Sequence, residues 1–202
     1  MIKAITFDLD GVYFINGKSN FIKSLGELGV SEEAAKRVFL QSDEMNLQYK
    51  TGKMTDEQFW TWALTEWKLS LTAQEIIDML IQGYDVDEHV VSIVKQVRAH
   101  GYKTLICTNN FPARINGLQK RFGFLDNFDV AVISSEVGAI KPQKELFETL
   151  IEKSGVEASE IFYADDYDAA IDTASELGIQ TLHYKDFDGF LGRLRELGVN
   201  MD

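Results

Sequence analysis

The 202-residue sequence is poor in cysteine, in proline and in long apolar stretches. Its single cysteine, Cys107, excludes an internal disulfide and fits a reducing compartment. Pro112 and Pro142 are the only prolines, so there is no proline-rich linker. No stretch reaches the roughly 20 apolar residues of a membrane helix, and the opening MIKAITF is too short an apolar run for a signal peptide. We therefore expect a cytoplasmic protein without a membrane partner.

Basic residues are also scarce relative to acidic ones. Lys and Arg number 20 against 32 Asp and Glu, which gives a formal net charge of -12. A surface of that sign repels the phosphate backbone of nucleic acids, so we expect no nucleic-acid partner. A small anionic substrate remains compatible with this charge, because one local cation can outweigh a distant field. The sequence does not indicate an oligomeric state.

Five short apolar runs, mostly separated by helical patterns, predict a parallel sheet. They cover residues 2–7, 103–108, 130–134, 161–164 and 179–184. These runs are mainly apolar and do not alternate strictly with polar residues, which is typical of strands that are buried on both faces. Amphipathic helical patterns lie between them and end at Gly101, Gly155 and Gly178. The alternation predicts an α/β fold with a doubly wound, Rossmann-like parallel sheet.

A long interval after the first run breaks this alternation. About 85 residues separate that run from the next helix–strand pair, far more than an ordinary crossover needs. Two helical patterns in the interval begin with capping boxes, at Thr55 and Thr72. We predict that residues 16–86 form an all-helical cap domain, inserted into an α/β core made of residues 1–15 and 87–202.

Within this predicted cap, aromatic and basic side chains are the candidates for contact with a substrate. We expect the aromatic residues to belong mainly to the core, since large aromatic residues at helical spacing usually pack inside. They are Tyr49, Phe59, Trp60, Trp62 and Trp67. We expect Lys50 and Lys53 to lie on a solvated face.

Polar side chains follow four of the predicted strands, at the point where each strand ends. They are Asp8 and Asp10, Thr108 and Asn109, Lys141, and Asp165 and Asp166. Ligands of open α/β sheets bind beyond the carboxyl ends of the strands, so these groups are expected to converge. Several carboxylates together can hold Mg²⁺, which prefers oxygen ligands. Such a cation would also cancel the repulsion between neighbouring acids.

These groups match the needs of one reaction, the transfer of a phosphoryl group. A phosphoryl group polarised by a metal can be attacked by the Asp8 carboxylate, although carboxylates are weak nucleophiles. Asp10 can protonate the leaving oxygen and later activate a water molecule. Thr108 and Lys141 can hold the phosphate oxygens.

Four motifs resemble those of the haloacid dehalogenase-like (HAD) superfamily: DLDGV, ICTNN, VGAIKP and YADD. The resemblance implies that Asp8 is the nucleophile and Asp10 the acid/base. It further implies that Thr108, next to Asn109, and Lys141 bind phosphate. Metal ligands would come from Asp8, from the backbone carbonyl of Asp10, and from the fourth-motif acids Asp165 and Asp166. The predicted helical insertion resembles the cap of the subgroup that includes phosphoglycolate phosphatases, beta-phosphoglucomutases and epoxide hydrolase N-terminal domains.

The sequence also departs from this family pattern at several positions. Val12 replaces a Thr that many phosphatases have and is found more often in phosphomutases, and Ala170 replaces an Asn of many relatives. The dehalogenases of the family lack the second Asp of the first motif, so Asp10 favours phosphoryl chemistry. We predict an Mg²⁺-dependent phosphatase that hydrolyses a small phosphorylated metabolite through an aspartyl-phosphate. A phosphomutase and a non-catalytic binding or regulatory protein remain alternatives.

Overall fold

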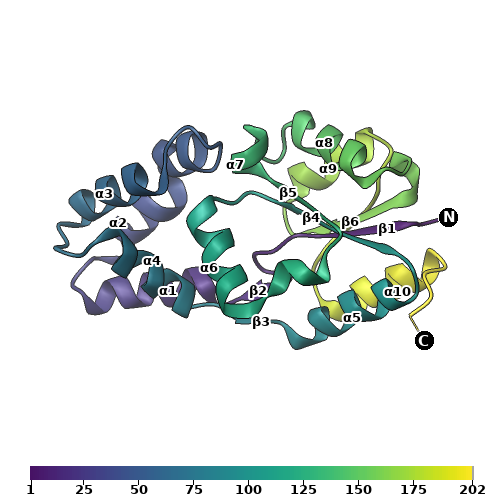
Figure 1. The fold of residues 1–202 in the computed structure, drawn as a ribbon, viewed down its shortest axis with the longest axis horizontal. Coiled ribbons are helices and arrows are strands. Elements are labelled where there is room, and N and C mark those ends of the chain that lie inside the picture. The colour runs from purple at the N-terminus through teal and green to yellow at the C-terminus, as the bar shows by residue number, and fades with distance from the viewer. Residues whose placement is uncertain (202) are drawn as a thin grey trace.

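A computed structural model describes residues 1–201 and contains a five-stranded parallel sheet with helices on both faces (Figure 1). The strand order is β5-β4-β1-β6-β7. The strands are β1 (Ala4–Phe7), β4 (Lys103–Thr108), β5 (Val130–Ile133), β6 (Ile161–Asp165) and β7 (Gln180–His183). All five lie where the apolar runs predict them, which confirms the doubly wound α/β fold class. The chain builds outward from β1 on one side and then returns to the other, so β1 and β6 flank the switch point where ligands bind in such sheets.

Two hydrophobic clusters lie on the two faces of this sheet. Helices α5 and α10 cover one face and α8 and α9 the other (Figure 1). The helices of this part are α5 (Glu88–Ala99), α6 (Pro112–Phe122), α7 (Ser134–Val137), α8 (Lys144–Ser154), α9 (Asp168–Glu176) and α10 (Phe187–Glu196). Cys107 is fully buried in the second cluster and acts there as a small apolar residue.

Between β2 (Phe14–Ile15) and β3 (Asp85–Val86) the chain forms a helical insertion. It contains α1 (Gly17–Glu27), α2 (Glu32–Lys36), the π-helical segments η1 (Arg37–Gln41) and η2 (Glu44–Tyr49), α3 (Asp56–Trp67) and α4 (Ala73–Gln82). Both predicted capping boxes are present, at Thr55 and Thr72. The antiparallel β2–β3 pair was not predicted, because two residues are too few for an alternating pattern. The division into a cap and a core domain stays a prediction.

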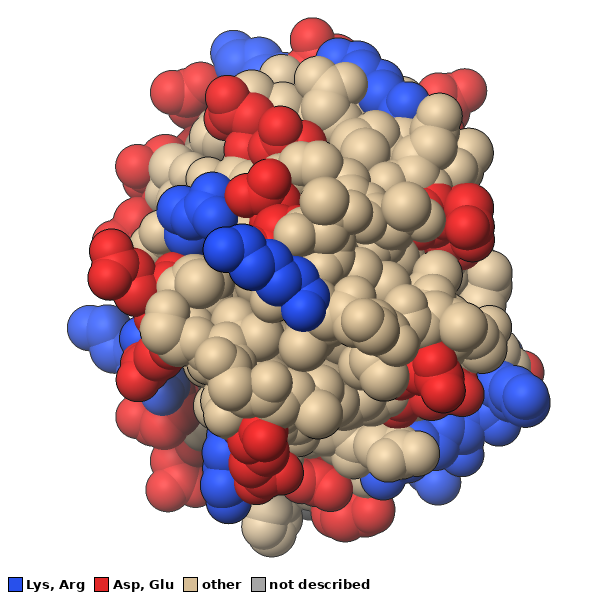
Figure 2. Space-filling model, turned by 90° about the vertical axis from the view of Figure 1, so that its left-hand side faces the viewer, with Lys and Arg blue, Asp and Glu red and all other residues tan. Residues whose placement is uncertain are grey.

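The insertion packs directly on the core through aromatic side chains. The ring of Tyr49 stacks on Phe59 of the insertion at 4.4 Å and on Phe111, which precedes α6, at 4.5 Å. Trp60 is fully buried and donates a hydrogen bond to the Tyr49 hydroxyl at 3.0 Å. Of the five aromatic residues predicted as core, four are buried, and Trp62 is half-buried and packs against the same cluster. On the outer face of the insertion, acidic and basic side chains are scattered around a broad uncharged area (Figure 2).

Within the described residues, no helix has the length and apolar character that crossing a membrane requires.

Gly52 lies close to the main chain of the core. Its φ is +73°, and a Cβ atom there would lie 2.2 Å from the carbonyl oxygen of Ser135 in α7.

Gly29 also has a positive φ, +88°, but its surroundings are open. We expect Gly29→Ala to lower the free energy of unfolding by about 1–2 kcal/mol through backbone strain alone. Gly52→Ala adds a steric clash and should cost at least about 1 kcal/mol more. Urea unfolding measures both, and equal losses would contradict this contact.

Candidate active site

Carboxylates from the tips of β1 and β6 lie side by side at the switch point. Phe7 of β1 pairs with Ala164 of β6, so the next residues, Asp8 and Asp165, lie at the same level at the carboxyl edge of the sheet. Asp8 is 7% exposed and Asp165 1% exposed, whereas Asp166 lies at the surface. One carboxylate oxygen from each of the three lies within 4.8 Å of the others. The structure therefore brings together three of the four acids predicted to hold a metal.

Lys141 neutralises part of this negative charge. Its Nζ atom lies 3.0 Å from Asp8 Oδ1 and 2.5 Å from Asp165 Oδ2, and it donates a third bond to the Cys107 carbonyl at 3.3 Å. Burial disfavours the charged ammonium, but the two carboxylates outweigh that effect and raise the pKa of Lys141. Lys141 is therefore a buried, permanently charged group, as a phosphate-binding role requires.

The acids of the site have carboxylate oxygens available as ligands for a hard cation. Burial raises the pKa of Asp8, and the nearby charges of Asp165 and Asp10 raise it further. The Lys141 charge lowers it but does not cancel the increase. Among the described residues, Asp8 Oδ1 accepts no regular hydrogen bond and has only the ion pair with Lys141. Three convergent carboxylate oxygens with an unsatisfied atom match the all-oxygen ligand sets that Mg²⁺ prefers. The residues present thus fit a magnesium ion.

Asp10 points to a different set of partners. Its Oδ2 atom lies 2.8 Å from the Arg114 guanidinium and 3.3 Å from Lys18 Nζ, and its Oδ1 atom accepts a bond from the Tyr84 hydroxyl at 3.1 Å. Burial acts to raise the pKa of Asp10, but the two positive charges outweigh it and hold that pKa at about 2. The Asp10 carboxylate is not among the three that converge, so the prediction that Asp10 takes part in metal binding relies on its backbone carbonyl.

Arg114 is the main residue of the site that the sequence did not reveal. Its side chain is buried, donates to Tyr84 at 2.9 Å and to Asn110 at 2.5 Å, and lies 4.8 Å from the ring of Phe111. The available signal was a charged residue on the apolar side of the helix that begins at Pro112. Such a residue must find an ionic partner when the helix packs, but the sequence does not say which one.

Thr108 and Asn109 lie at the tip of β4, as predicted. Thr108 is buried and lines the site. The Asn109 side chain accepts a hydrogen bond from the backbone N–H of Lys141 at 2.7 Å and donates to the Lys141 carbonyl at 3.2 Å. The Asn109 amide therefore holds the loop that carries Lys141. Its predicted contact with phosphate remains a prediction.

Gly11, which follows Asp8 and Asp10, adopts a backbone conformation that favours glycine. Gly11 has a φ of +83°, and a Cβ atom on it would lie 3.3 Å from Asp166 Oδ2. The turn closes with a hydrogen bond from the Gly11 N–H to the Phe14 carbonyl at 2.8 Å. Glycine at this position lets the chain reverse directly beside the acids.

A cavity of about 160 Å³ contains all seven predicted site residues. Lys18, Lys50 and Tyr167 complete its lining. Lys53 is exposed as predicted, but the prediction of a solvated face for Lys50 was wrong. Lys50 directly follows the π-helical segment η2, next to the buried Tyr49, and its side chain lines the site.

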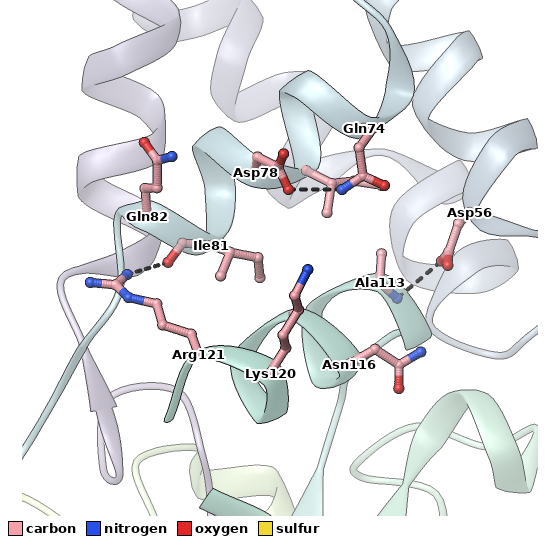
Figure 3. A pocket seen from close by; sticks show the side chains of 11 residues that line it. Asp56, Gln74, Asp78, Ile81, Gln82, Ala113, Asn116, Lys120 and Arg121 are labelled. Carbon is pink, nitrogen blue, oxygen red and sulfur yellow. Dashed lines mark hydrogen bonds between the residues drawn. The ribbon is translucent and has the colours of Figure 1, made fainter. Parts of the chain in front are cut away.

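A larger cavity, of about 520 Å³, lies between α4 and α6 (Figure 3). The labelled Lys120 side chain projects into it, and Asp56 on its edge accepts a hydrogen bond from the backbone N–H of Ala113 at 3.1 Å. None of the seven predicted site residues lines this cavity. The smaller cavity is therefore the candidate active site.

Comparison with known proteins places the chain in a family. The model for haloacid dehalogenase-like hydrolases matches residues 2–178. The chain belongs to this hydrolase family. An uncharacterised protein of Dictyostelium discoideum is 29% identical over 160 residues, which span 74% of this chain and 66% of that relative. The chain thus covers just under two thirds of that relative's length.

Two solved structures share the fold at low sequence identity. An HAD-family enzyme from Bacteroides thetaiotaomicron, in complex with magnesium and inorganic phosphate, has a TM-score of 0.80 at 21% identity, covering 94% of this chain and 99% of that one. An HAD phosphatase from Thermococcus onnurineus has a TM-score of 0.67 at 23% identity, with both chains covered in full. The family resemblance predicted from the four motifs is confirmed.

Asp166 offers a test of the proposed metal site that leaves the buried groups intact. Because Asp166 is exposed, Asp166→Asn should not lower the melting temperature of the apoprotein. We expect it to weaken Mg²⁺ binding about 10-fold or more, and so to reduce the rise in melting temperature that Mg²⁺ produces in the wild type. Isothermal titration calorimetry measures the affinity. Asp172→Asn, at an exposed acid of α9, is the control, and a wild-type affinity in Asp166→Asn would exclude Asp166 as a ligand.

The Asp10–Arg114 pair offers a test of the network. Arg114→Met leaves a buried carboxylate without its main counter-ion and should lower the free energy of unfolding by about 3–5 kcal/mol. Asp10→Asn leaves the Arg114 charge uncompensated. We expect the double variant to lose less than the sum of the single losses, with a coupling of about 1–3 kcal/mol in urea unfolding. Strict additivity would contradict a direct interaction.

Proposed function

We propose that the protein is an Mg²⁺-dependent phosphatase that hydrolyses a small phosphorylated metabolite through an aspartyl-phosphate intermediate. The observation that carries this proposal is the arrangement of Asp8, with Lys141 at 3.0 Å and two further carboxylates on the neighbouring strand. A nucleophile, a cation for phosphate oxygens and a metal-ligand set all face one small cavity. The magnesium-bound HAD enzyme of the same fold supports the choice of metal.

In the first half of the reaction, Asp8 attacks the phosphorus atom and the bond to the leaving oxygen breaks. Lys141 and Thr108 hold the phosphoryl oxygens, so that charge developing on them meets donors already in place. Asp10 gives a proton to the leaving oxygen. In the free enzyme the Arg114 and Lys18 charges keep Asp10 ionised, so Asp10 must take up a proton from solvent as the substrate binds before it can act as the acid.

In the second half, a water molecule attacks the phosphorus atom of the aspartyl-phosphate. Asp10, now a base, takes the proton of that water, and Asp8 is released as a carboxylate. Arg114 and Tyr84 keep the Asp10 side chain facing the cavity in both halves.

Asp8, Asp165, Asp166 and the backbone carbonyl of Asp10 are the groups that would hold magnesium. When bound there, the ion polarises the phosphoryl group and offsets the repulsion between Asp8 and the phosphate. The helical insertion, with Lys18 and Lys50 on the cavity wall, would exclude bulk water and select the substrate.

Replacement of the nucleophile tests this function. We expect Asp8→Asn to lose about 10³-fold or more of the Mg²⁺-dependent hydrolysis of p-nitrophenyl phosphate, because the amide cannot form the aspartyl-phosphate. Circular dichroism should show an intact fold. Asp172→Asn is again the control. Substantial activity of Asp8→Asn, in a preparation free of wild-type enzyme, would exclude the proposed nucleophile, and wild-type protein inactive on every phosphoester would exclude the function.

A phosphomutase uses the same groups but passes the phosphoryl group to a sugar hydroxyl. Hydrolysis in ¹⁸O-labelled water distinguishes the two. A phosphatase incorporates the label into released inorganic phosphate, whereas a mutase yields an isomeric sugar phosphate without label.

A further inference from the structure

Two lysines of the helical insertion line the active-site cavity together with the catalytic acids. Lys18 lies in the first turn of α1, and Lys50 follows η2. Lys18 pairs with Asp10 at 3.3 Å. Among the described residues, the Lys50 side chain donates one hydrogen bond, to the amide oxygen of Asn46 at 2.9 Å. Both lysines come from outside the sheet, from the part of the chain that faces the strand tips.

Lys50 is a half-buried lysine, and among the described residues no acidic side chain pairs with it. In the part of the chain that the structure describes, the ion pairs of the site join Lys18 and Arg114 to Asp10 and Lys141 to the strand-tip acids, and none reaches Lys50. Burial, together with the charges of Arg114 and Lys18, lowers the pKa of Lys50 to about 7. Removing a cation from water without a partner is unfavourable, so an anion placed beside Lys50 gains from relieving that cost.

The position of these lysines indicates which part of a substrate they face. Phosphoryl transfer takes place at Asp8 and Lys141, whereas the leaving group must lie beside Asp10, which protonates it. Lys18 contacts Asp10 directly, and the Asp10 charge acts on Lys50 as well. The two lysines therefore lie on the leaving-group side of the cavity.

We propose that the substrate is a small phosphate ester whose leaving group carries a second anionic group, a carboxylate or another phosphate, which Lys50 binds with the help of Lys18. The proposal rests on the phosphatase function above and specifies its substrate class. A cavity of about 160 Å³ suits a compact ester, since sites for drug-sized ligands hold about 300–1,000 Å³. The second anion replaces the missing counter-ion of Lys50.

Three matched esters test this inference: phospholactate, the isosteric lactamide phosphate, and propane-1,2-diol bisphosphate. We expect the wild type to show kcat/KM at least about 10-fold higher for phospholactate or the bisphosphate than for the uncharged amide, because charge-assisted hydrogen bonds are strong. The preferred anionic ester identifies the second group as carboxylate or phosphate. Equal preference for the two supports recognition of negative charge itself.

Lys50→Met removes the charge and keeps most of the side-chain length. We expect it to abolish the preference for anionic esters, mainly by raising KM for these esters. Lys53→Met, at an exposed lysine of the same loop, should retain the preference. Calorimetric titration of the Asp8→Asn protein with phospholactate should show about 10-fold weaker binding when Lys50→Met is added.

The outcomes separate this inference from the function on which it rests. If the wild type hydrolyses the amide as well as the anionic esters, or if Lys50→Met slows all three esters equally, the second-anion site is excluded while the phosphatase function stands. If the wild type hydrolyses none of the esters and no p-nitrophenyl phosphate in the presence of Mg²⁺, the phosphatase function itself is contradicted.

Discussion

The mutual repulsion of the carboxylates at one edge of the sheet governs how the rest of the site is built. Asp8 and Asp165 are almost inaccessible to water, which would otherwise screen their charges. Two cations offset this repulsion: Lys141 forms ion pairs with both of these acids, and Arg114 forms one with Asp10. Each cation is buried, so each is held in place by the acids it neutralises. Charge balance and geometry thus depend on the same contacts.

Helix α6 joins the chemistry to the helical insertion. It starts directly after the tip of β4 and carries Arg114 on its inner side. Its first turn is held by the insertion, because Asp56 accepts a hydrogen bond from the Ala113 N–H and another from the Tyr49 hydroxyl. Tyr84, at the other end of the insertion, binds Arg114 and Asp10 together. A shift of the insertion therefore acts on the proposed acid/base through two separate contacts.

The predictable part of this molecule is the part that local sequence determines. Buried parallel strands appear as continuous apolar runs, and the side chains that follow them are bound to meet, so the strand-tip residues from Asp8 to Asp166 could be named from the sequence. Capping boxes are equally local. Arg114 and Lys50 were missed for the opposite reason. Their positions depend on how α6 and η2 pack against segments far away in the chain, and a lone Lys or Arg has the same local pattern whether it faces water or a cavity.

The basic residues of the site fall into two groups, which we assign to phosphoryl transfer and to recognition of the leaving group. Lys141 lies in the loop before α8 and Arg114 on α6, where the acids fix them, and they face the acids that we propose to take part in phosphoryl transfer. Lys18 and Lys50 belong to the insertion and have weaker ties, one long ion pair and one amide contact. Substitutions in the insertion can therefore alter the charge that meets a leaving group without removing a residue that holds the phosphate. Substrate choice can change in this fold while the strand-tip chemistry stays the same.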